Sequence, residues 1–415
     1  MSLIVRRRLA YYRVEKGSSS AAAADSLHIA RSHLVNFEYG RRNFTEELLV
    51  DLMGYLEVPF EFYQAPFERD LELAKRLPVF LEDVLAEESR FFSEVERLAE
   101  KKIQDLKSEL SIKYLLSAYY YSRREYHLAE KLDGDCLSIF NKTDDPSLLP
   151  WEVLPYFYIQ QIEKHKFLGN LNESHRLYLK LKPWVEGSSS LFYVHLKSIR
   201  NCLKRGDYQE AFKHSEEIGQ LVDANLPAYL QAQLLTVRIA IHIYFNQFFK
   251  GEELLKQLKE LATVHSLEEF LISYSQHRGY LLEKKGDNAT AVAEYEKALL
   301  SEPGEGLKII LGISLASNYI HLKNFKKTRE MIESLRHQPL RTREQYIISS
   351  LEAQLFLYED KEKDHWKLQR KCIQYFRENG CKRDLEHIYS YLGDYYYAKS
   401  KYKKAADFYK MKEAL

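Results

Sequence analysis

The sequence predicts an all-α protein in which a small N-terminal helical domain precedes a right-handed solenoid of antiparallel helix pairs. The 415 residues include only 16 Gly and 10 Pro, which argues against a turn-rich β fold. Residues that favour helices, such as Leu, Lys, Glu and Ala, are abundant. A pattern of small and aromatic residues also recurs along the chain, as expected for stacked helical repeats.

The overall composition is that of a folded and nearly neutral protein. Apolar residues make up 45% of the chain, which is enough to fill a core. Lys and Arg number 61 against 60 Asp and Glu, so the whole chain is not a polycation. No stretch approaches the roughly 18–20 consecutive apolar residues that span a bilayer, and no signal peptide is recognisable. We therefore expect a cytoplasmic protein without membrane contact.

The sequence contains no pattern typical of a catalytic or metal site. P-loop, dinucleotide-binding, zinc-protease and nucleophile-elbow motifs are absent. The 14 histidines are scattered, and His195, His242 and His321 fit surface or inter-helix positions better than metal ligands. The cysteines show no zinc spacing, and we expect reduced core thiols. The sequence thus predicts no enzyme, no metal and no cofactor. The four cysteines are Cys136, Cys202, Cys372 and Cys381.

The first sixty residues predict four short helices. The first lies around Leu9–Arg13, and the second covers Ala21–Ser26 after a run of serines that offers N-caps. His28 makes the turn to a third helix at about Ala30–Tyr39, and Thr45 caps the fourth. The residues expected in the core are Leu3, Val5, Leu9, Tyr12, Ala23, Ala24, Leu27, Ile29, Leu34, Phe37, Leu48, Leu49, Leu52, Met53 and Leu56.

The N-terminal segment also carries a surplus of positive charge. Between Met1 and Asn43 eight basic residues stand against three acidic ones. A small positive module on a neutral body suits contact with phosphates, although a solvated basic face explains the charge equally well. The basic residues are Arg6, Arg7, Arg8, Arg13, Lys16, Arg31, Arg41 and Arg42.

The spacing from Lys16 to Asn43 resembles the phage-repressor (Xre-type) helix-turn-helix. The pattern fits without a gap over about sixty residues. Ser20 and Ala23 stand where this family often has Gln and Leu, so a degenerate module that only dimerises stays an alternative. The matching positions are Gly17, Ala24, Leu27, Ile29, Arg31, Ser32, Leu34, Phe37, Glu38 and Gly40.

This resemblance implies that the third helix enters the major groove of DNA. We expect Arg31 to read guanine and Asn36 to read adenine, with simple exposure to solvent as the alternative. The Arg6–Arg8 run and Asn43 are expected near phosphates. Glu38 fits a structural salt bridge, for example to Arg13, better than a base contact. The full set predicted to contact DNA is Ser20, Arg31, Ser32, His33, Asn36, Arg41 and Arg42.

The rest of the chain resembles tetratricopeptide repeats. Two copies are clearest: one carries Gly279, Ala291 and Tyr295, and the other carries Gly393 and Tyr409. Small residues stand where two antiparallel helices touch, and aromatic residues fill the holes between repeats. About eight copies recur 37–45 residues apart, longer than the standard repeat of about 34. Loops are expected at 144–150 and 186–190.

The first helix of each pair is expected to line a concave groove. Amides on this wall suit the backbone of an extended peptide, and Arg200 or Lys204 suits a carboxylate. An ordinary solvated helix surface is the alternative for any single residue. The predicted peptide-binding residues are Tyr193, Arg200, Asn201, Lys204, Gln233, Gln276, Tyr280, Asn318, His321 and Gln354, with Tyr244, Ser317 and Tyr358 on the same wall.

These features predict a three-part organisation. A helix-turn-helix domain occupies residues 1–62, linker helices occupy 63–108, and the repeat domain occupies 109–415. Because solenoid ends need covering, we expect the segment Tyr395–Leu415 to meet the partner in a homodimer.

A helix-turn-helix fused to tetratricopeptide-like repeats resembles the RRNPP family of Gram-positive quorum-sensing regulators (Rgg, PlcR, NprR and relatives). The segment Ala30–Gly40 is the most Rgg-like, and the length of the array is closer to NprR. The resemblance implies a homodimeric transcription regulator that binds palindromic double-stranded promoter DNA and is switched by a short signalling peptide. The alternative is a Rap-like scaffold whose repeats bind a response regulator or another protein.

Overall fold

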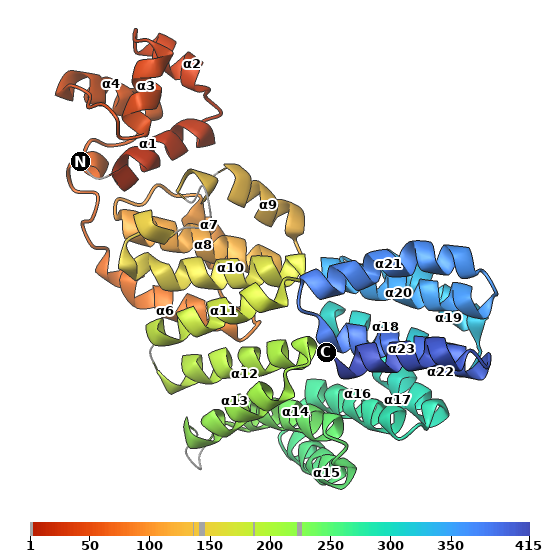
Figure 1. The fold of residues 1–415 in the computed structure, drawn as a ribbon. Coiled ribbons are helices and arrows are strands. Elements are labelled where there is room, and N and C mark those ends of the chain that lie inside the picture. The colour runs from red at the N-terminus through yellow and green to blue at the C-terminus, as the bar shows by residue number, and fades with distance from the viewer. Residues whose placement is uncertain (1–2, 136, 141–145, 186, 222–225) are drawn as a thin grey trace. The chain divides into compact units, whose positions relative to one another are not determined.

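The computed structural model describes residues 3–135, 137–140, 146–185, 187–221 and 226–415 (Figure 1). Every regular element in these ranges is helical, which confirms the all-α prediction. None of the described helices combines the length and apolarity needed to cross a bilayer. The chain divides into two compact units, which are described separately. Unit 1 comprises Met1–Lys164 and Leu177–Tyr193, and unit 2 comprises His165–Arg176 and Val194–Leu415.

Unit 1 begins with the predicted module of four short helices. Ser19 Oγ accepts a hydrogen bond from Ala22 N (3.1 Å) and so caps the second helix, while Thr45 caps the fourth. His28 has a φ of 52° in the turn between the second and third helices. These observations confirm the predicted boundaries. The helices are α1 (Leu3–Glu15), α2 (Ser20–Ser26), α3 (Arg31–Glu38) and α4 (Glu46–Leu56).

Small residues allow the helices of this module to approach closely. Ala23 and Ala24 on α2 are completely buried, as are Leu34 and Phe37 on α3. The Ala-rich second helix therefore packs against α3 without larger side chains. Of the predicted core residues, only Leu3, Ile29 and Leu48 are half-buried rather than buried.

The remainder of unit 1 consists of the helices that follow this module. Helices α10, α11 and α12 run through residues assigned to both units. The helices are α5 (Glu61–Gln64), α6 (Leu71–Leu85), α7 (Phe92–Ala99), α8 (Leu106–Ser122), α9 (Tyr126–Asp135), α10 (Leu154–Leu168), α11 (Leu171–Leu181) and α12 (Ser188–Arg205).

Unit 2 continues as a succession of antiparallel helix pairs. In each pair from α14/α15 to α22/α23 the two helices contact one another, and neighbouring pairs also touch. The helices are α13 (Tyr208–Leu221), α14 (Ala228–Tyr244), α15 (Phe248–Val264), α16 (Glu268–Lys284), α17 (Asn288–Leu300), α18 (Glu305–His321), α19 (Phe325–Arg336), α20 (Thr342–Tyr358), α21 (Glu362–Glu378), α22 (Lys382–Ala398) and α23 (Tyr402–Glu413).

The repeats are longer than a standard tetratricopeptide repeat because their first helices are long. The first helices α14, α16, α18, α20 and α22 begin at residues 228, 268, 305, 342 and 382, so the repeat length is 37–40 residues. Each of these five helices has 17 residues. This agrees with the expectation that extended helices lengthen the repeat.

The loop and cysteine predictions have mixed outcomes. Cys136 and residues 144–145 lie outside the described residues, and 146–148 form a short 3-10 helix. The loop expected at 186–190 is wrong from Ser188 onward, because the serines there begin α12. Cys202, Cys372 and Cys381 are buried free thiols, as predicted.

Two glycines set the separation of the paired helices. The ring of Tyr295 on α17 lies against Gly279 on α16, so that a Cβ there would stand 2.6 Å from the ring. The ring of Tyr409 on α23 lies in the same way against Gly393 on α22. The two sequence motifs that identified the repeats therefore mark real helix–helix contacts.

We predict that Gly279→Ala destabilises unit 2, although alanine is normally the better helix former. The added methyl group collides with a ring that is itself buried, and such overpacking costs about 1–3 kcal/mol. Urea denaturation followed by circular dichroism measures the free energy of unfolding.

Gly54→Ala is the matched control, because Gly54 lies within α4 and a Cβ there meets nothing within 4 Å. This substitution is expected to leave stability unchanged or to raise it by up to about 1 kcal/mol. Equal effects of the two substitutions would contradict the packing role of Gly279.

Candidate functional site

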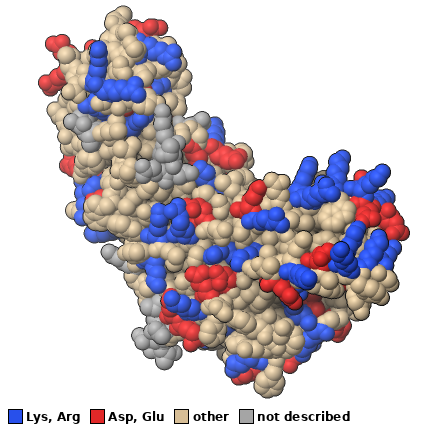
Figure 2. Space-filling model, viewed as in Figure 1, with Lys and Arg blue, Asp and Glu red and all other residues tan. Residues whose placement is uncertain are grey.

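The basic residues predicted to contact DNA are only partly available at the surface. Arg31 and Ser32 at the start of α3 are exposed, as are Arg41 and Arg42 after its end. Basic side chains gather on the face of the α1–α4 module that is turned to the viewer in Figure 2. The Nε of Arg31 donates a hydrogen bond to Ser20 Oγ on α2 (3.0 Å), so these two predicted residues form one cluster.

Two further residues of α3 are less exposed than predicted. His33 is half-buried, and the edge of its ring contacts Phe44 at a centroid distance of 5.1 Å. Phe44 in turn stacks on Phe37 in the core. Asn36 is also half-buried. Both side chains are therefore only partly available to DNA, and for His33 the reason is its contact with Phe44 in the segment after α3.

The salt bridge predicted for Glu38 is present. Arg13 Nε and Nη2 donate to the two carboxylate oxygens of Glu38 at 2.7 and 2.9 Å, and Arg13 also donates to the carbonyl oxygen of Ser18 (2.8 Å). This two-pronged geometry is the strong form of an Arg–carboxylate contact. It holds the end of α3 on α1 and confirms the structural role assigned to Glu38.

The proposed contact of the Arg6–Arg8 run with phosphates is wrong for two of the three arginines. Arg6 is buried and donates to the carbonyl oxygen of Arg42 (2.7 Å) and to the side chain of Asn43. Arg7 is half-buried, with its guanidinium over the ring of Tyr39. Arg8 is 1% exposed. Arg6 and Arg8 therefore make contacts inside the protein and are not available at its surface.

Arg8 instead belongs to a buried polar network within unit 1. Its Nε pairs with Glu109 Oε2 on α8 at 2.7 Å, and the hydroxyl of Tyr12 donates to the same carboxylate (2.7 Å). Nη1 of Arg8 donates to the carbonyl oxygen of Gln104 (2.9 Å). Burial raises the pKa of Glu109, while the charges of Arg8 and Lys113 and the Tyr12 hydroxyl oppose the rise. The network fixes α1 directly on α8.

The predicted peptide-binding residues divide into a buried group and an accessible group. Five are buried, and Tyr193 among these lies in unit 1. The amides of this group mostly tie neighbouring helices together: Asn201 donates to Ser174 Oγ (3.1 Å), and Asn318 donates to Glu283 Oε2 (2.9 Å). The prediction that these residues are exposed on a groove wall is therefore wrong. The buried residues are Tyr193, Asn201, Gln233, Asn318 and Gln354. The residues that retain exposed surface are Arg200, Lys204, Gln276, Tyr280 and His321.

Several accessible residues of unit 2 lie together although they come from different repeats. Arg200 on α12 donates to Gln233 on α14 at 2.5 Å. The guanidinium of Arg383 on α22 lies over the ring of Tyr280 on α16, 5.3 Å from its centroid. The charge of Glu283 on α16 also acts on Arg383. First helices that are a hundred residues apart thus present side chains to one shared polar cluster.

Two histidines near this cluster have lowered pKa values. Burial lowers the pKa of His277 on α16 to about 4, and the charge of Arg200 adds to this effect. Desolvation likewise lowers the pKa of His387 on α22 to about 4, although water still reaches its side chain. Both rings are therefore neutral at pH 7.

Sequence reasoning missed the contribution of α22 to this cluster. Arg383 and His387 are one helical turn apart on the first helix of the last pair, and the charge of Glu283 acts on both. The spacing of four residues was visible in the sequence. What it could not indicate is that α22 and α16 face the same space.

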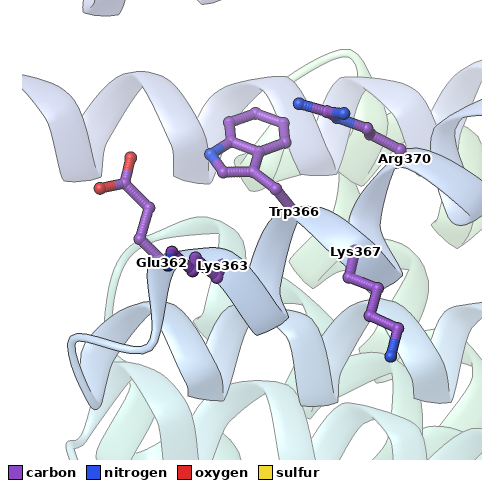
Figure 3. A pocket seen from close by; sticks show the side chains of 5 residues that line it. All are labelled: Glu362, Lys363, Trp366, Lys367 and Arg370. Atoms are coloured by element: carbon purple, nitrogen blue, oxygen red, sulfur yellow. The ribbon is translucent and has the colours of Figure 1, made fainter.

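A shallow pocket elsewhere in unit 2 has a different character. It is lined by residues of α21 alone, which include Trp366 and the cations Lys363, Lys367 and Arg370 (Figure 3). The Trp366 ring stacks on Phe408 of α23. All of its lining residues come from one helix.

Two groups of potential metal ligands also come together in unit 2. One consists of His175, Cys202 and Glu210, and the other of His195, His214 and Glu217. Local spacing of histidines in the sequence gave no sign of either group, since each joins residues from separate helices.

Two comparisons with known proteins bear on this architecture. The transcriptional activator NprA of Geobacillus stearothermophilus is 23% identical over 361 residues, which cover 78% of this chain and 82% of that protein. The crystal structure of a Rap protein complexed with competence and sporulation factor matches with a TM-score of 0.64 and 13% identity, over 83% of this chain and 97% of the Rap chain. No protein-family model matches. The comparisons confirm the resemblance to the RRNPP-type regulators and the tetratricopeptide-like repeat fold.

We predict that Glu109→Gln destabilises unit 1 strongly, because it leaves the buried guanidinium of Arg8 without a counter-charge. Removal of one partner of a buried ion pair costs about 3–5 kcal/mol. Thermal unfolding followed by circular dichroism, with urea denaturation for the free energy, measures the loss.

Glu72→Gln is the surface control, since the Glu72–Lys75 pair on α6 is exposed and is worth at most about 1 kcal/mol. The double variant Arg8→Met with Glu109→Met removes both charges and is expected to recover part of the stability. If Glu109→Gln were no more harmful than Glu72→Gln, the network would not hold α1 on α8.

Proposed function

We propose that this protein is a DNA-binding transcription regulator controlled by a short signalling peptide bound by its repeat domain. In this proposal residues 1–62 bind DNA, residues 63–108 link the two parts, and residues 109–415 bind the peptide and form the dimer. The observation that carries it is the exposed basic edge of the N-terminal module, where Arg31, Arg41 and Arg42 all lie at the surface. The similarity to a transcriptional activator over 78% of the chain supports it.

DNA recognition is assigned to the start of α3 and to the segment after it. Arg31 and Ser32 present donors where a recognition helix meets base edges, and the Arg31 fork suits guanine. Ser20 holds the Arg31 guanidinium at 3.0 Å, which orients the fork before it meets DNA. Arg41 and Arg42 contribute phosphate contacts, and Asn36 and His33 serve as flanking contacts.

Peptide binding is assigned to the polar cluster shared by α12, α16, α18 and α22. Arg200, Lys204 and Arg383 provide cations for carboxylates, and Gln276 and His321 provide hydrogen bonds for a peptide backbone. Tyr280 adds a flat apolar surface. The Rap structure that shares this fold was solved with competence and sporulation factor bound, which supports a ligand-binding role for such repeats.

A homodimer would match a palindromic promoter, because each half-site then meets one helix-turn-helix. The last helix pair exposes apolar surface suited to such a contact: Tyr397 and Tyr402 are 61% and 60% exposed, and Met411 is 49% exposed. Peptide binding would favour one arrangement of the helices over another. The rigid attachment of α1 to α8 would then carry the change to the DNA-binding module.

We predict that Arg31→Ala weakens sequence-specific DNA binding. The test is selection of double-stranded DNA from a random library by the purified full-length protein at several salt concentrations. An inverted repeat is expected from the wild-type protein. Loss of a bidentate guanine contact costs about 1–3 kcal/mol, which is roughly a tenfold to hundredfold loss of affinity for the selected site.

Two variants separate base recognition from simple charge. Arg69→Ala removes an exposed arginine outside the helix-turn-helix and is expected to preserve the selected sequence. Arg31→Lys keeps the charge, so it is expected to keep the salt dependence and lose specificity. A wild-type protein that selects no sequence, with or without peptide, would rule out DNA regulation and favour the Rap-like scaffold that binds a protein partner.

We predict that Arg200→Ala weakens peptide binding about tenfold or more, the usual value of a charge-assisted hydrogen bond. A random library of short peptides is selected on the purified protein, and the affinity of the enriched peptide is then measured by fluorescence polarisation. Lys256→Ala is the charge-matched control, because Lys256 lies on the second helix α15 and is 79% exposed. An equal loss in both variants would mean that the peptide binds by net charge and not in the cluster.

A further inference from the structure

We propose that His195, His214 and Glu217 bind a divalent transition-metal ion of the Zn²⁺ class. The three ligand atoms are Nδ1 of each histidine and Oε2 of the glutamate. Nδ1 of His195 lies 3.2 Å from Glu217 Oε2, Nδ1 of His214 lies 3.3 Å from the same oxygen, and the two Nδ1 atoms are 3.3 Å apart. One nearly equilateral triangle therefore contains all three atoms.

This triangle has the dimensions of one face of a tetrahedral zinc site. Zinc binds histidine nitrogen at about 2.0–2.1 Å and carboxylate oxygen at about 2.0–2.2 Å. Tetrahedral angles then place any two ligand atoms about 3.3 Å apart. The observed spacing of the three atoms is therefore compatible with one ion at these lengths. Two histidines and one carboxylate leave one position open for water or another group.

The helices hold these ligands in place before any ion arrives. His214 and Glu217 are three residues apart on one face of α13, and His195 faces them from α12. The side chains of His195 and His214 are 2% and 6% exposed, so packing restricts their rotamers. The side chain of Glu217 is 30% exposed, which leaves a path for the ion from solvent.

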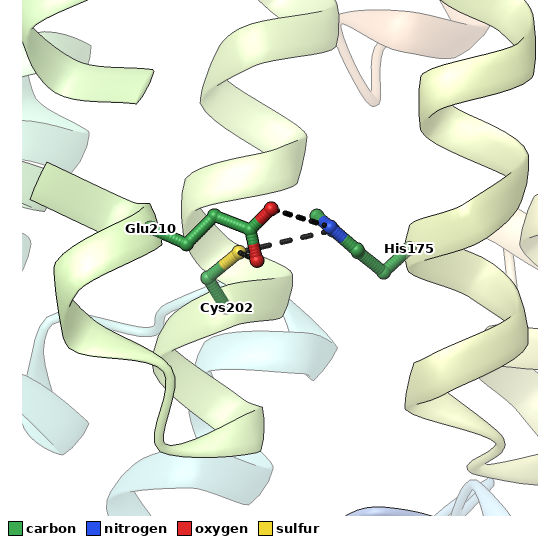
Figure 4. A group of neighbouring side chains, drawn as sticks. All are labelled: His175, Cys202 and Glu210. Carbon is green, nitrogen blue, oxygen red and sulfur yellow. Dashed lines mark hydrogen bonds and ion pairs between the residues drawn. The ribbon is translucent and has the colours of Figure 1, made fainter. Parts of the chain in front are cut away.

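The neighbouring group of His175, Cys202 and Glu210 lacks this convergence (Figure 4). There the histidine uses different ring nitrogens for its partners: Nε2 lies 3.0 Å from Glu210, and Nδ1 lies 3.8 Å from Cys202 Sγ. Arg205 stands 3.7 Å from the same glutamate and supplies a positive charge. This group is an internal hydrogen-bonded cluster and serves as a built-in comparison.

An ion at the proposed site would clamp α12 to α13. Helix α12 also carries Arg200 and Lys204 of the polar cluster, one to three turns beyond His195. The metal would therefore stiffen one wall of that cluster. The metal site stands on its own geometry and does not depend on the proposed regulatory function.

The test is a titration of chelator-treated full-length protein with Zn²⁺, and separately with Co²⁺ as a spectroscopic probe. We expect one ion per chain, a rise of the unfolding temperature with Zn²⁺, and the visible absorption bands of tetrahedral Co²⁺. Glu217→Gln and His214→Gln are each expected to lower the affinity at least about tenfold. Circular dichroism before the titration establishes that each variant is folded; Glu217→Gln preserves shape at a partly exposed position.

Two variants serve as matched controls. Glu216→Gln removes an exposed carboxylate adjacent in sequence, and His175→Gln alters the neighbouring group; both are expected to keep full affinity and the Co²⁺ spectrum. Equal Zn²⁺ affinity in Glu217→Gln and Glu216→Gln would overturn the proposal. So would loss of binding in His175→Gln alone, or absence of stoichiometric binding to the wild-type protein.

Discussion

The buried ion pair between Arg8 and Glu109 is the contact on which the organisation of unit 1 depends. It joins α1, the first helix of the N-terminal module, to α8, the first long helix of the repeats, at 2.7 Å and with almost no exposure of either side chain. A buried charge tolerates the loss of its partner poorly, so the two helices separate only at high cost. The ion pair therefore ties the N-terminal module firmly to α8.

Contacts inside the module explain why its net charge is an imprecise guide to the surface proposed to bind DNA. Eight basic residues occur before residue 43. Of these, Arg6, Arg8 and Arg13 instead bind carbonyl oxygens and carboxylates within unit 1. Lys16 pairs with Glu57. The exposed basic residues that remain lie at the start of α3 and just after its end.

The repeats obey a second constraint, the close approach of paired helices. A ring pressed against Gly279 or Gly393 leaves no space for a Cβ, so the separation of the two helices is set by these contacts. Stacking such pairs brings α16 and α22 to one polar cluster, where Tyr280 meets Arg383. The cluster therefore comes from the packing of the first helices of separate repeats. It does not come from any local motif.

The sequence by itself determined the helices and the repeat length, because caps, turns and helical periodicity act between residues near in the chain. It also indicated the Arg13–Glu38 pair, although these residues lie on different helices. The positions of the repeat-motif glycines at helix–helix contacts could also be predicted from this periodicity. The tertiary structure alone decided that Arg8 is buried on Glu109, that Asn201 and Asn318 tie helices together instead of lining a wall, and that His195 meets His214 and Glu217. These outcomes depend on which helices become neighbours and how they are rotated. The partner of a side chain on another helix depends on many packing contacts across the domain, so a short stretch of sequence cannot predict it.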